Sequence, residues 1–330
     1  DKCGSSSTYS ETIDTSGEHA KRIVSSSGCP NHYNYVTGRQ GNTGIGVEGT
    51  ITWSYEQSSH ENVEIPANPV LLSMDDAFGI EYRMGMIGIA LNGVAFYGGA
   101  VDTDGNILDV DDDKAEWTSF DFCSGHASGF GEYHYHFPPS CLLDKLTKFS
   151  DGHSPQIGWS LDGFPIYGVK GPSGVDMKHC GTSDAHSDYC TDDCSGYEGE
   201  LPGIDNFKYR YYITGATSDL STLPSYPRPA ATDYPFTIKC YRGCEMGKMS
   251  NRKCSKRAVA GYTDAYTATA NSGFTEVLTF ANDKKCTSST TPAPTPAPTT
   301  GECYSWCANN PKSWDKKCNW AKCEGCSECR

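Results

Sequence analysis

The chain has 330 residues and a formal net charge of −14, and 37% of its residues are hydrophobic. This length allows two domains, or one large domain with appendages. The acidic balance argues against nucleic acid or an anionic membrane as a partner, because like charges repel, and it makes calcium the simplest cation to expect. Abundant glycine (35), proline (18) and tyrosine (20) favour short strands, turns and loops over long helices.

The 17 cysteines indicate an oxidising compartment and a framework of disulfide bonds. No apolar run of about 18 residues is present, so we predict no membrane span. Because the sequence begins at Asp1, we expect a signal peptide to have been removed and the mature protein to be secreted. The odd count predicts one cysteine in residues 1–286 that is either buried and free or paired outside the chain.

The first predicted element is a β-hairpin over residues 86–100, "MIGIALNGVAFYGGA", with an Asn-Gly turn signal. This stretch recurs at residues 156–170 as "QIGWSLDGFPIYGVK". Two further blocks recur in the same order, "DFCSGH" as "DDCSGY" and "YHYH" as "YRYY". We therefore predict a mainly β fold with two tandem divergent β-rich repeats, over about 86–150 and 156–245, in one disulfide-bonded domain of residues 1–286.

An acidic stretch, "DTDGNILDVDDD", follows the first hairpin at residues 102–113. Its glycine comes too early for an EF-hand, and no flanking helices are evident. A solvated acidic turn is therefore one interpretation, and a weak calcium site is the other. The candidate calcium ligands are Asp102, Asp104, Asn106 and Asp109.

The stretch "GEYHYHFPPSC", residues 131–141, predicts a strand with period-two alternation. Successive side chains of a strand point to opposite faces, so His134 and His136 share one face and Tyr133 and Tyr135 share the other. Two imidazoles about 6.5–7 Å apart along a strand can converge on one metal ion. Imidazole ligands favour copper or zinc as that ion.

Two more histidines are candidate ligands for the same ion, His126 in "CSGH" and His153 in "DGHSPQIGW". Cys123 and Cys141 bracket the strand and are placed to staple it. The three histidines of the first repeat change together in the second, from His126, His134 and His136 to Tyr197, Arg210 and Tyr212. This change fits a functional site kept in one copy and lost in the other, and it also fits divergence of a structural strand.

No known catalytic motif accompanies these residues. The sequence contains no G-x-S-x-G elbow, no HExxH helix and no P-loop. Asp162 in "LDG" has the side chain to orient a histidine, but its counterpart Asn92 indicates a role in a turn. The sequence therefore predicts no catalytic residue and favours a protein that is not an enzyme, while catalysis at a metal stays open.

Residues 287–302, "TSSTTPAPTPAPTTGE", predict an extended linker. Threonines beside prolines suit O-glycosylation of a stalk. The predicted glycosylation sites are Thr290, Thr291, Thr295, Thr299 and Thr300.

The segment of residues 303–330 is too short for a self-sufficient core, so we expect disulfides to hold it, with a zinc site as the alternative. Its tryptophans either stack on sugar rings or fill a small core. The cysteines are Cys303, Cys307, Cys318, Cys323, Cys326 and Cys329, and the tryptophans are Trp306, Trp314 and Trp320.

Several of these motifs resemble the YHYH-domain protein family of bacteria and algae. The resemblance rests on "CSGHASGFGEYHYHFPPSCL", "IGWSLDGFPIYG", "YRYYITG" and "YPFTIKCYRG", and "SSGCPNHYNY" and "IPANP" extend it over about residues 20–250. It implies a secreted or surface protein with a histidine-bearing β domain, and no particular activity. The tail resembles small six-cysteine modules of algal extracellular proteins.

Three functions are compatible with these features. The first is a secreted structural glycoprotein that self-associates into a filament or a wall or surface layer, with a structural metal at the histidines. The second is a copper- or zinc-binding metalloprotein or metalloenzyme. The third is a polysaccharide-binding protein that uses the C-terminal tryptophans. We expect the first, with strand addition by the N-terminal stretch "KCGSSSTYSETID" or the linker as the join.

Overall fold

The computed structural model describes residues 7–32, 34–35, 51–52, 59–80, 83–98, 120–127, 132–217, 236–255, 261–263, 266–276 and 278. The chain divides into two units, Asp1–Ala281 and Asn282–Arg330, and the second lies wholly outside the described residues. The predicted calcium ligands in 102–113, the glycosylated linker 287–302, and the cysteines and tryptophans of 303–330 therefore lie outside them as well.

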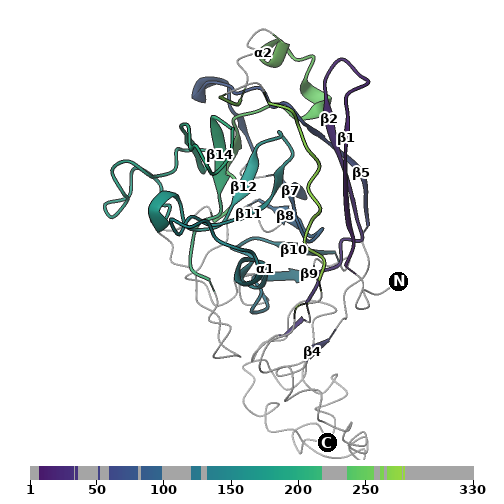
Figure 1. Cartoon of the computed structure of the whole chain (residues 1–330), viewed down its shortest axis with the longest axis vertical. Coiled ribbons are helices and arrows are strands. Elements are labelled where there is room, and N and C mark those ends of the chain that lie inside the picture. Colours follow the sequence, from purple (N-terminus) through teal and green to yellow (C-terminus); the bar gives the residue numbers. More distant parts are fainter. Residues whose placement is uncertain are drawn as a thin grey trace, which may run out of the picture. The chain divides into compact units, whose positions relative to one another are not determined.

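The described part of the chain is mainly β, as predicted. An eight-stranded sheet carries most of the strands, and a three-stranded sheet lies along one side of the domain (Figure 1). The eight strands, in spatial order, are β13 (Gly196–Glu198), β14 (Tyr209–Tyr212), β12 (Pro165–Tyr167), β11 (Gln156–Ser160), β7 (Met86–Ala90), β8 (Ala95–Tyr97), β10 (Tyr133–Tyr135) and β9 (Gly125–Ala127).

The remaining elements are short. The three-stranded sheet has the order β1 (Tyr9–Asp14), β2 (Lys21–Ser26) and β5 (His60–Pro66). Two further sheets have two strands each. One pairs β6 (Phe78–Gly79) with β15 (Cys240–Tyr241), and the other pairs β3 (Asn34–Tyr35) with β4 (Ile51–Thr52). The helical elements are α1 (Ser140–Lys145), α2 (Arg252–Ser255) and the 3-10 turns η1 (Met74–Asp76), η3 (Pro172–Gly174) and η5 (Met246–Lys248). Neither α-helix has the length or the apolar character that a membrane span requires, and this finding covers the described residues only.

The eight-stranded sheet has the same strand pattern in each half. In one half β7 and β8 form an antiparallel hairpin, β10 lies parallel to β8, and β9 closes the edge antiparallel to β10. In the other half β11, β12, β14 and β13 make the same set of pairings. The recurring sequence blocks occupy equivalent positions in the two halves, which meet where β7 pairs with β11.

Glycine turns close the two hairpins, as the Asn-Gly and Asp-Gly signals predict. Gly93 has a φ of +84° and Gly163 a φ of +98°, which disfavour any residue with a Cβ. Both turns also pack tightly against the three-stranded sheet. A Cβ at Gly93 would lie 2.7 Å from Cβ of Ser26 on β2, and one at Gly163 would lie 2.5 Å from the carbonyl oxygen of Pro66 on β5.

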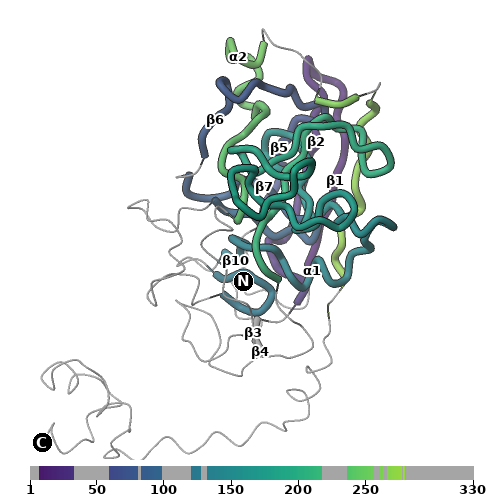
Figure 2. The backbone as a smooth tube through the Cα atoms, turned by 90° about the vertical axis from the view of Figure 1, so that its left-hand side faces the viewer, coloured from purple at the N-terminus to yellow at the C-terminus, as the bar shows by residue number. Residues whose placement is uncertain are grey.

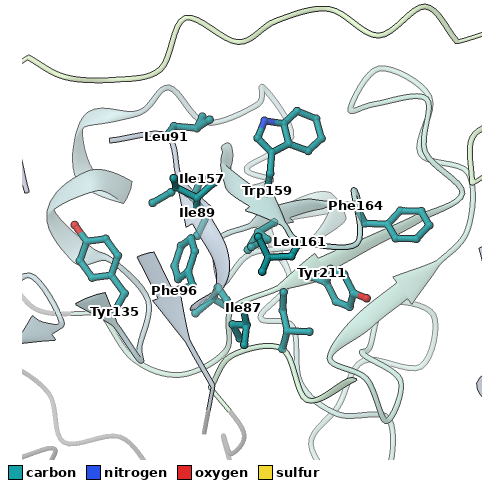
Figure 3. Close-up of a cluster of buried hydrophobic side chains, with 14 of the residues drawn as sticks. Ile87, Ile89, Leu91, Phe96, Tyr135, Ile157, Trp159, Leu161, Phe164 and Tyr211 are labelled. Carbon is teal, nitrogen blue, oxygen red and sulfur yellow. The ribbon is translucent and has the colours of Figure 1, made fainter. Parts of the chain in front are cut away.

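The seam between the halves depends on two other glycines. A Cβ at Gly88 on β7 would lie 2.8 Å from the carbonyl oxygen of Trp159, and one at Gly158 on β11 would lie 2.5 Å from that of Ile89. Side chains of both halves form one apolar cluster at this seam (Figure 3). Its labelled members are Ile87, Ile89, Leu91, Phe96, Tyr135, Ile157, Trp159, Leu161, Phe164 and Tyr211.

The segment of residues 266–276 joins the two large sheets (Figure 1, yellow-green). Its Phe274 amide donates to the Leu91 carbonyl in the first hairpin turn. Its Asn271 amide donates to the Glu11 carboxylate on β1, and its Thr269 carbonyl accepts from the Arg22 guanidinium on β2. This late segment therefore holds the N-terminal sheet to the central sheet.

Disulfides stabilise the loops around the sheet. The pairs are Cys123–Cys141, Cys180–Cys190, Cys194–Cys240 and Cys244–Cys254, and Cys29 is also disulfide-bonded. Every cysteine in the described part of the chain is bonded, so no buried free thiol occurs there. The other two cysteines of residues 1–286, Cys3 and Cys286, lie outside the described residues.

A methyl group at the seam should destabilise the whole domain. We expect Gly158→Ala to lower the free energy of unfolding by about 1–3 kcal/mol or more, because the strands cannot separate without breaking their pairing. Gly79→Ala is the matched control, since a Cβ there meets no atom within 4 Å, and it should change stability by less than about 0.5 kcal/mol. Urea unfolding of both variants measures the difference, and equal stabilities would contradict this account of the seam.

Candidate metal centre

Three histidines meet at the outer edge of the first half of the sheet. His134 lies on β10, and its direct cross-strand partner on β9 is His126. His136 follows β10 by one residue and lies on the same face as His134, with ring centroids 4.8 Å apart. Tyr133 and Tyr135 lie on the opposite face, as the period-two alternation predicts.

The ligand atoms of these three side chains converge in the interior of the protein. They all lie within 4.8 Å of one another, and the Nε2 atoms of His126 and His134 are 3.0 Å apart. The exposed fractions are 1% for His126, 3% for His134 and 2% for His136. Zinc–nitrogen bonds of about 2.0–2.1 Å place tetrahedral ligand atoms about 3.3 Å apart, so small side-chain movements would bring all three into coordination distance.

Backbone carbonyls decide which ring nitrogens face the cluster. Nδ1 of His134 lies 3.0 Å from the Glu132 carbonyl, and Nδ1 of His136 lies 2.8 Å from the Gly98 carbonyl. Since a carbonyl oxygen only accepts, each Nδ1 carries the proton and donates. The Nε2 atoms are then unprotonated, which is the form that binds a metal ion. It also follows that His126 donates the hydrogen bond to His134 Nε2.

The surroundings keep all three imidazoles neutral. Burial lowers the pKa of His126 and His134 well below the usual value, and the neighbouring histidines lower it further. Burial lowers the pKa of His136 to about 4, against the opposing effect of its bond to Gly98. Metal binding therefore does not have to displace an imidazolium proton at neutral pH.

Aromatic rings form the walls of the cluster. Tyr97 on β8 stacks on His134 with centroids 3.9 Å apart, and Phe120 packs 4.3 Å from His126 and 5.5 Å from His136. The Tyr97 hydroxyl donates to Glu132 at 2.7 Å, which fixes its ring against His134. These rings limit the positions that the imidazoles can take.

The loops that carry the histidines are held from outside the sheet. The Cys123–Cys141 disulfide joins the residues before β9 to α1, so it brackets the histidine strand as the sequence suggests. Asp121 accepts from the Cys123 and Gly125 amides and from the Tyr133 hydroxyl, at 2.8–3.2 Å. The connection between β9 and its preceding turn is therefore fixed relative to β10.

The equivalent position in the second half holds an ion pair in place of the histidines. Arg210 replaces His134 and lies opposite Tyr197 on β13. Its guanidinium is fully buried and makes two bonds of 2.9 Å to the Asp205 carboxylate. It also donates to the Gly199 and Phe207 carbonyls. In the second half the positively charged Arg210 side chain therefore occupies the position that His134 has in the first half.

His153 does not join the three-histidine cluster. Its Nε2 lies 2.7 Å from the hydroxyl of Tyr212, the counterpart of His136, and its ring packs on Tyr167. The structure therefore places His153 beside the Arg210 ion pair in the second half, and the cluster of described ligands consists of three histidines.

Asp162 has a structural role in its turn. Its carboxylate accepts from the Tyr211 hydroxyl at 2.7 Å and from the Gly243 amide at 2.8 Å. Burial raises the pKa of Asp162 to about 6. None of its hydrogen bonds joins it to a histidine.

Sequence reasoning missed the groups that orient the ligands. The carbonyls of Gly98 and Glu132 carry no side-chain signal at all. Tyr97 belongs to a recurring block, but Tyr167 occupies the same place in the half without histidines, so the pattern could not mark it. Phe120 adjoins the block "DFCSGH" without being part of the recurrence.

The fold and the cluster define a disulfide-bonded β protein with a buried group of three imidazoles. The chain belongs to the YHYH protein family, whose model matches residues 62–243. The matched range contains both halves of the eight-stranded sheet and all three clustered histidines. Comparison with curated proteins and with solved structures gives no match.

The depressed pKa of His136 predicts a pH-dependent stability in the metal-free protein. Between pH 6.5 and pH 4 the unfolded chain binds a proton at this residue and the folded chain does not, so the free energy of unfolding falls as the pH falls. We expect a loss of about 3 kcal/mol from His136 by pH 4. Urea unfolding with a chelator present, at pH 7.5 and pH 4.5, measures it.

His136→Asn is the comparison variant, because its amide can still donate to Gly98 but does not titrate. Its stability should fall less between the two pH values than that of the wild type. An identical fall in both proteins would show that His136 is not the responsible group.

Proposed function

We propose that the protein is a metal-binding protein that holds one copper or zinc ion through the Nε2 atoms of His126, His134 and His136. The observation that carries the proposal is the convergence of three buried, neutral imidazoles, two of which are oriented by Nδ1 bonds to carbonyls. Metal-ligating histidines commonly use this arrangement, with one nitrogen on the ion and the other on a carbonyl.

The neutral nitrogens of the cluster are suited to bind a cation. The Nε2 lone pairs of His134 and His136 are both directed toward the centre of the three-histidine cluster. The Nε2 proton of His126 lies between the His126 and His134 rings. A metal ion would bind the Nε2 lone pairs of His134 and His136 directly, and that of His126 after its proton moves from Nε2 to Nδ1. In the other half the Arg210 guanidinium is the cation, and it donates to Asp205 and to the Gly199 carbonyl.

The three imidazole ligands limit which metal ions can bind and how many coordination positions the protein fills. Imidazole ligands suit zinc and copper better than calcium or magnesium, which take oxygen ligands. Three protein ligands leave the fourth position of a tetrahedral ion for water or another group. The site therefore supports either a structural role or chemistry at the fourth position, and we assign no catalytic residue.

The protein is proposed to work outside the cell. Four disulfides within the described residues suit an oxidising compartment. Self-association into a filament or wall layer, and polysaccharide binding by residues 303–330, stay predictions. Part of the N-terminal stretch proposed for strand addition forms β1, which pairs with β2 of the same chain. Light scattering of the purified protein tests self-association, and a monomer at all concentrations would contradict it.

Metal binding can be measured directly on the full chain. We expect elemental analysis after dialysis against zinc or copper to give one ion per chain, because Arg210 fills the equivalent position in the second half. His126→Asn and His134→Asn should each weaken binding by more than about 100-fold, since loss of an outer-shell partner alone typically costs 10–100-fold.

His179→Asn is the control, because His179 is exposed and pairs with Asp193 outside the cluster. It should bind the ion as the wild type does. The wild type should also melt at a higher temperature with the metal than with a chelator, since an ion bound only by the folded state stabilises it. Failure to retain copper or zinc, or retention undiminished in His126→Asn, would refute the proposal.

A further inference from the structure

Strand β6 and helix α2 lie toward the same end of the domain (Figure 2). An open pocket of about 900 Å³ has Gly79 of β6 in its lining. Strands β6 and β15 and the turn η5 provide its lining. Its volume falls in the range of small-molecule sites. The histidine cluster contributes no lining residue, so the pocket is a separate feature.

The charge of this pocket is opposite to that of the chain. Arg83, Lys239 and Lys248 line it with three positive charges, and Glu245 contributes the single negative one. The chain as a whole carries −14. A local cationic surface on an acidic protein concentrates small anions at one place, while the rest of the surface repels long polyanions.

Two of the three cations, Arg83 and Lys248, are held in place before any ligand arrives. The Glu245 carboxylate accepts from Arg83 and from Lys248, each at 2.6 Å. Lys248 also lies 4.9 Å over the ring of Phe78, and the Arg83 guanidinium lies 5.9 Å over that of Tyr241. Groups fixed in this way lose little further freedom when they bind a ligand.

The pocket also exposes backbone to a ligand. Gly79 and Gly247 both line it, and a Cβ built at either position meets no atom within 4 Å. Ile80, which is buried, adds an apolar side chain to the lining. The lining therefore combines cationic donors with an apolar side chain, which suits an organic group that carries an oxyanion.

We propose that this pocket binds a small organic oxyanion of the size of one acidic sugar residue, with its carboxylate or sulfate group held between Arg83, Lys239 and Lys248. Guanidinium and ammonium groups are the usual partners of both anions. The proposal is independent of the metal site, because no residue is shared between them.

The test is titration of the full-length protein with sodium glucuronate at low ionic strength, followed by calorimetry. We expect saturable binding that weakens as salt is added, because the contact is between charges. Inorganic sulfate should compete for the same site. Galactose, which has the ring but no charge, should not bind.

Gly247→Glu is the decisive variant, because it places a carboxylate in the open space without a steric clash. It should weaken glucuronate binding by at least tenfold, and Lys239→Gln should weaken it as well. Gly17→Glu adds the same charge in the exposed turn between β1 and β2 and should leave binding unchanged.

Circular dichroism of each variant shows whether the domain is folded. The proposal is overturned if the wild type shows no saturable binding of glucuronate, if galactose binds equally well, or if folded Gly247→Glu binds as the wild type does. Binding of inorganic sulfate without glucuronate also overturns it, because the ligand would not be an organic anion.

Discussion

The close approach of β7 and β11 is the constraint on which the rest of the structure depends. Two four-stranded halves become one eight-stranded sheet only because Gly88 and Gly158 allow the paired backbones to meet. The apolar cluster at the seam then takes side chains from both halves, from the three-stranded sheet through Val24 and Ile65, and from α1 through Leu142. Each half in turn extends outward to an edge where β9 or β13 closes the sheet, and these edges carry the polar groups that distinguish the halves.

The two edges of the sheet contain different buried polar groups at equivalent positions. In the second half Arg210 brings a fixed positive charge, which Asp205 and two carbonyls satisfy. In the first half three neutral imidazoles converge, with the Nε2 lone pairs of His134 and His136 directed at the cluster and His126 donating to His134. The backbone that holds both sets is alike, down to Asp121 and Asp192, which each accept from a tyrosine hydroxyl and from two amides. The halves differ in these side chains and in the connection between β13 and β14, which supplies Asp205 and the Gly199 and Phe207 carbonyls to Arg210.

The facing of the histidines and the positions of the hairpins were predictable from the sequence, because strand periodicity and turn signals depend only on neighbouring residues. The alternation in "YHYH" places His134 and His136 on one face whatever surrounds the strand, and the two glycine turns define their hairpins. The assignment of His153 to the cluster could not be judged in this way. Its distance from β10 depends on which half of the sheet its loop packs against, and neither spacing nor composition contains that information.

The sequence by itself determined the β class, the disulfide-rich character, the two hairpins and the facing of the histidine strand, because each follows from residue type and short-range order. Only the tertiary structure decided that His126 lies directly across from His134, that carbonyls of Gly98 and Glu132 orient the rings, and that a cationic pocket forms between β6, β15 and η5. These features join residues distant in the chain, and non-local contacts depend on how the strands pair and pack rather than on any local pattern.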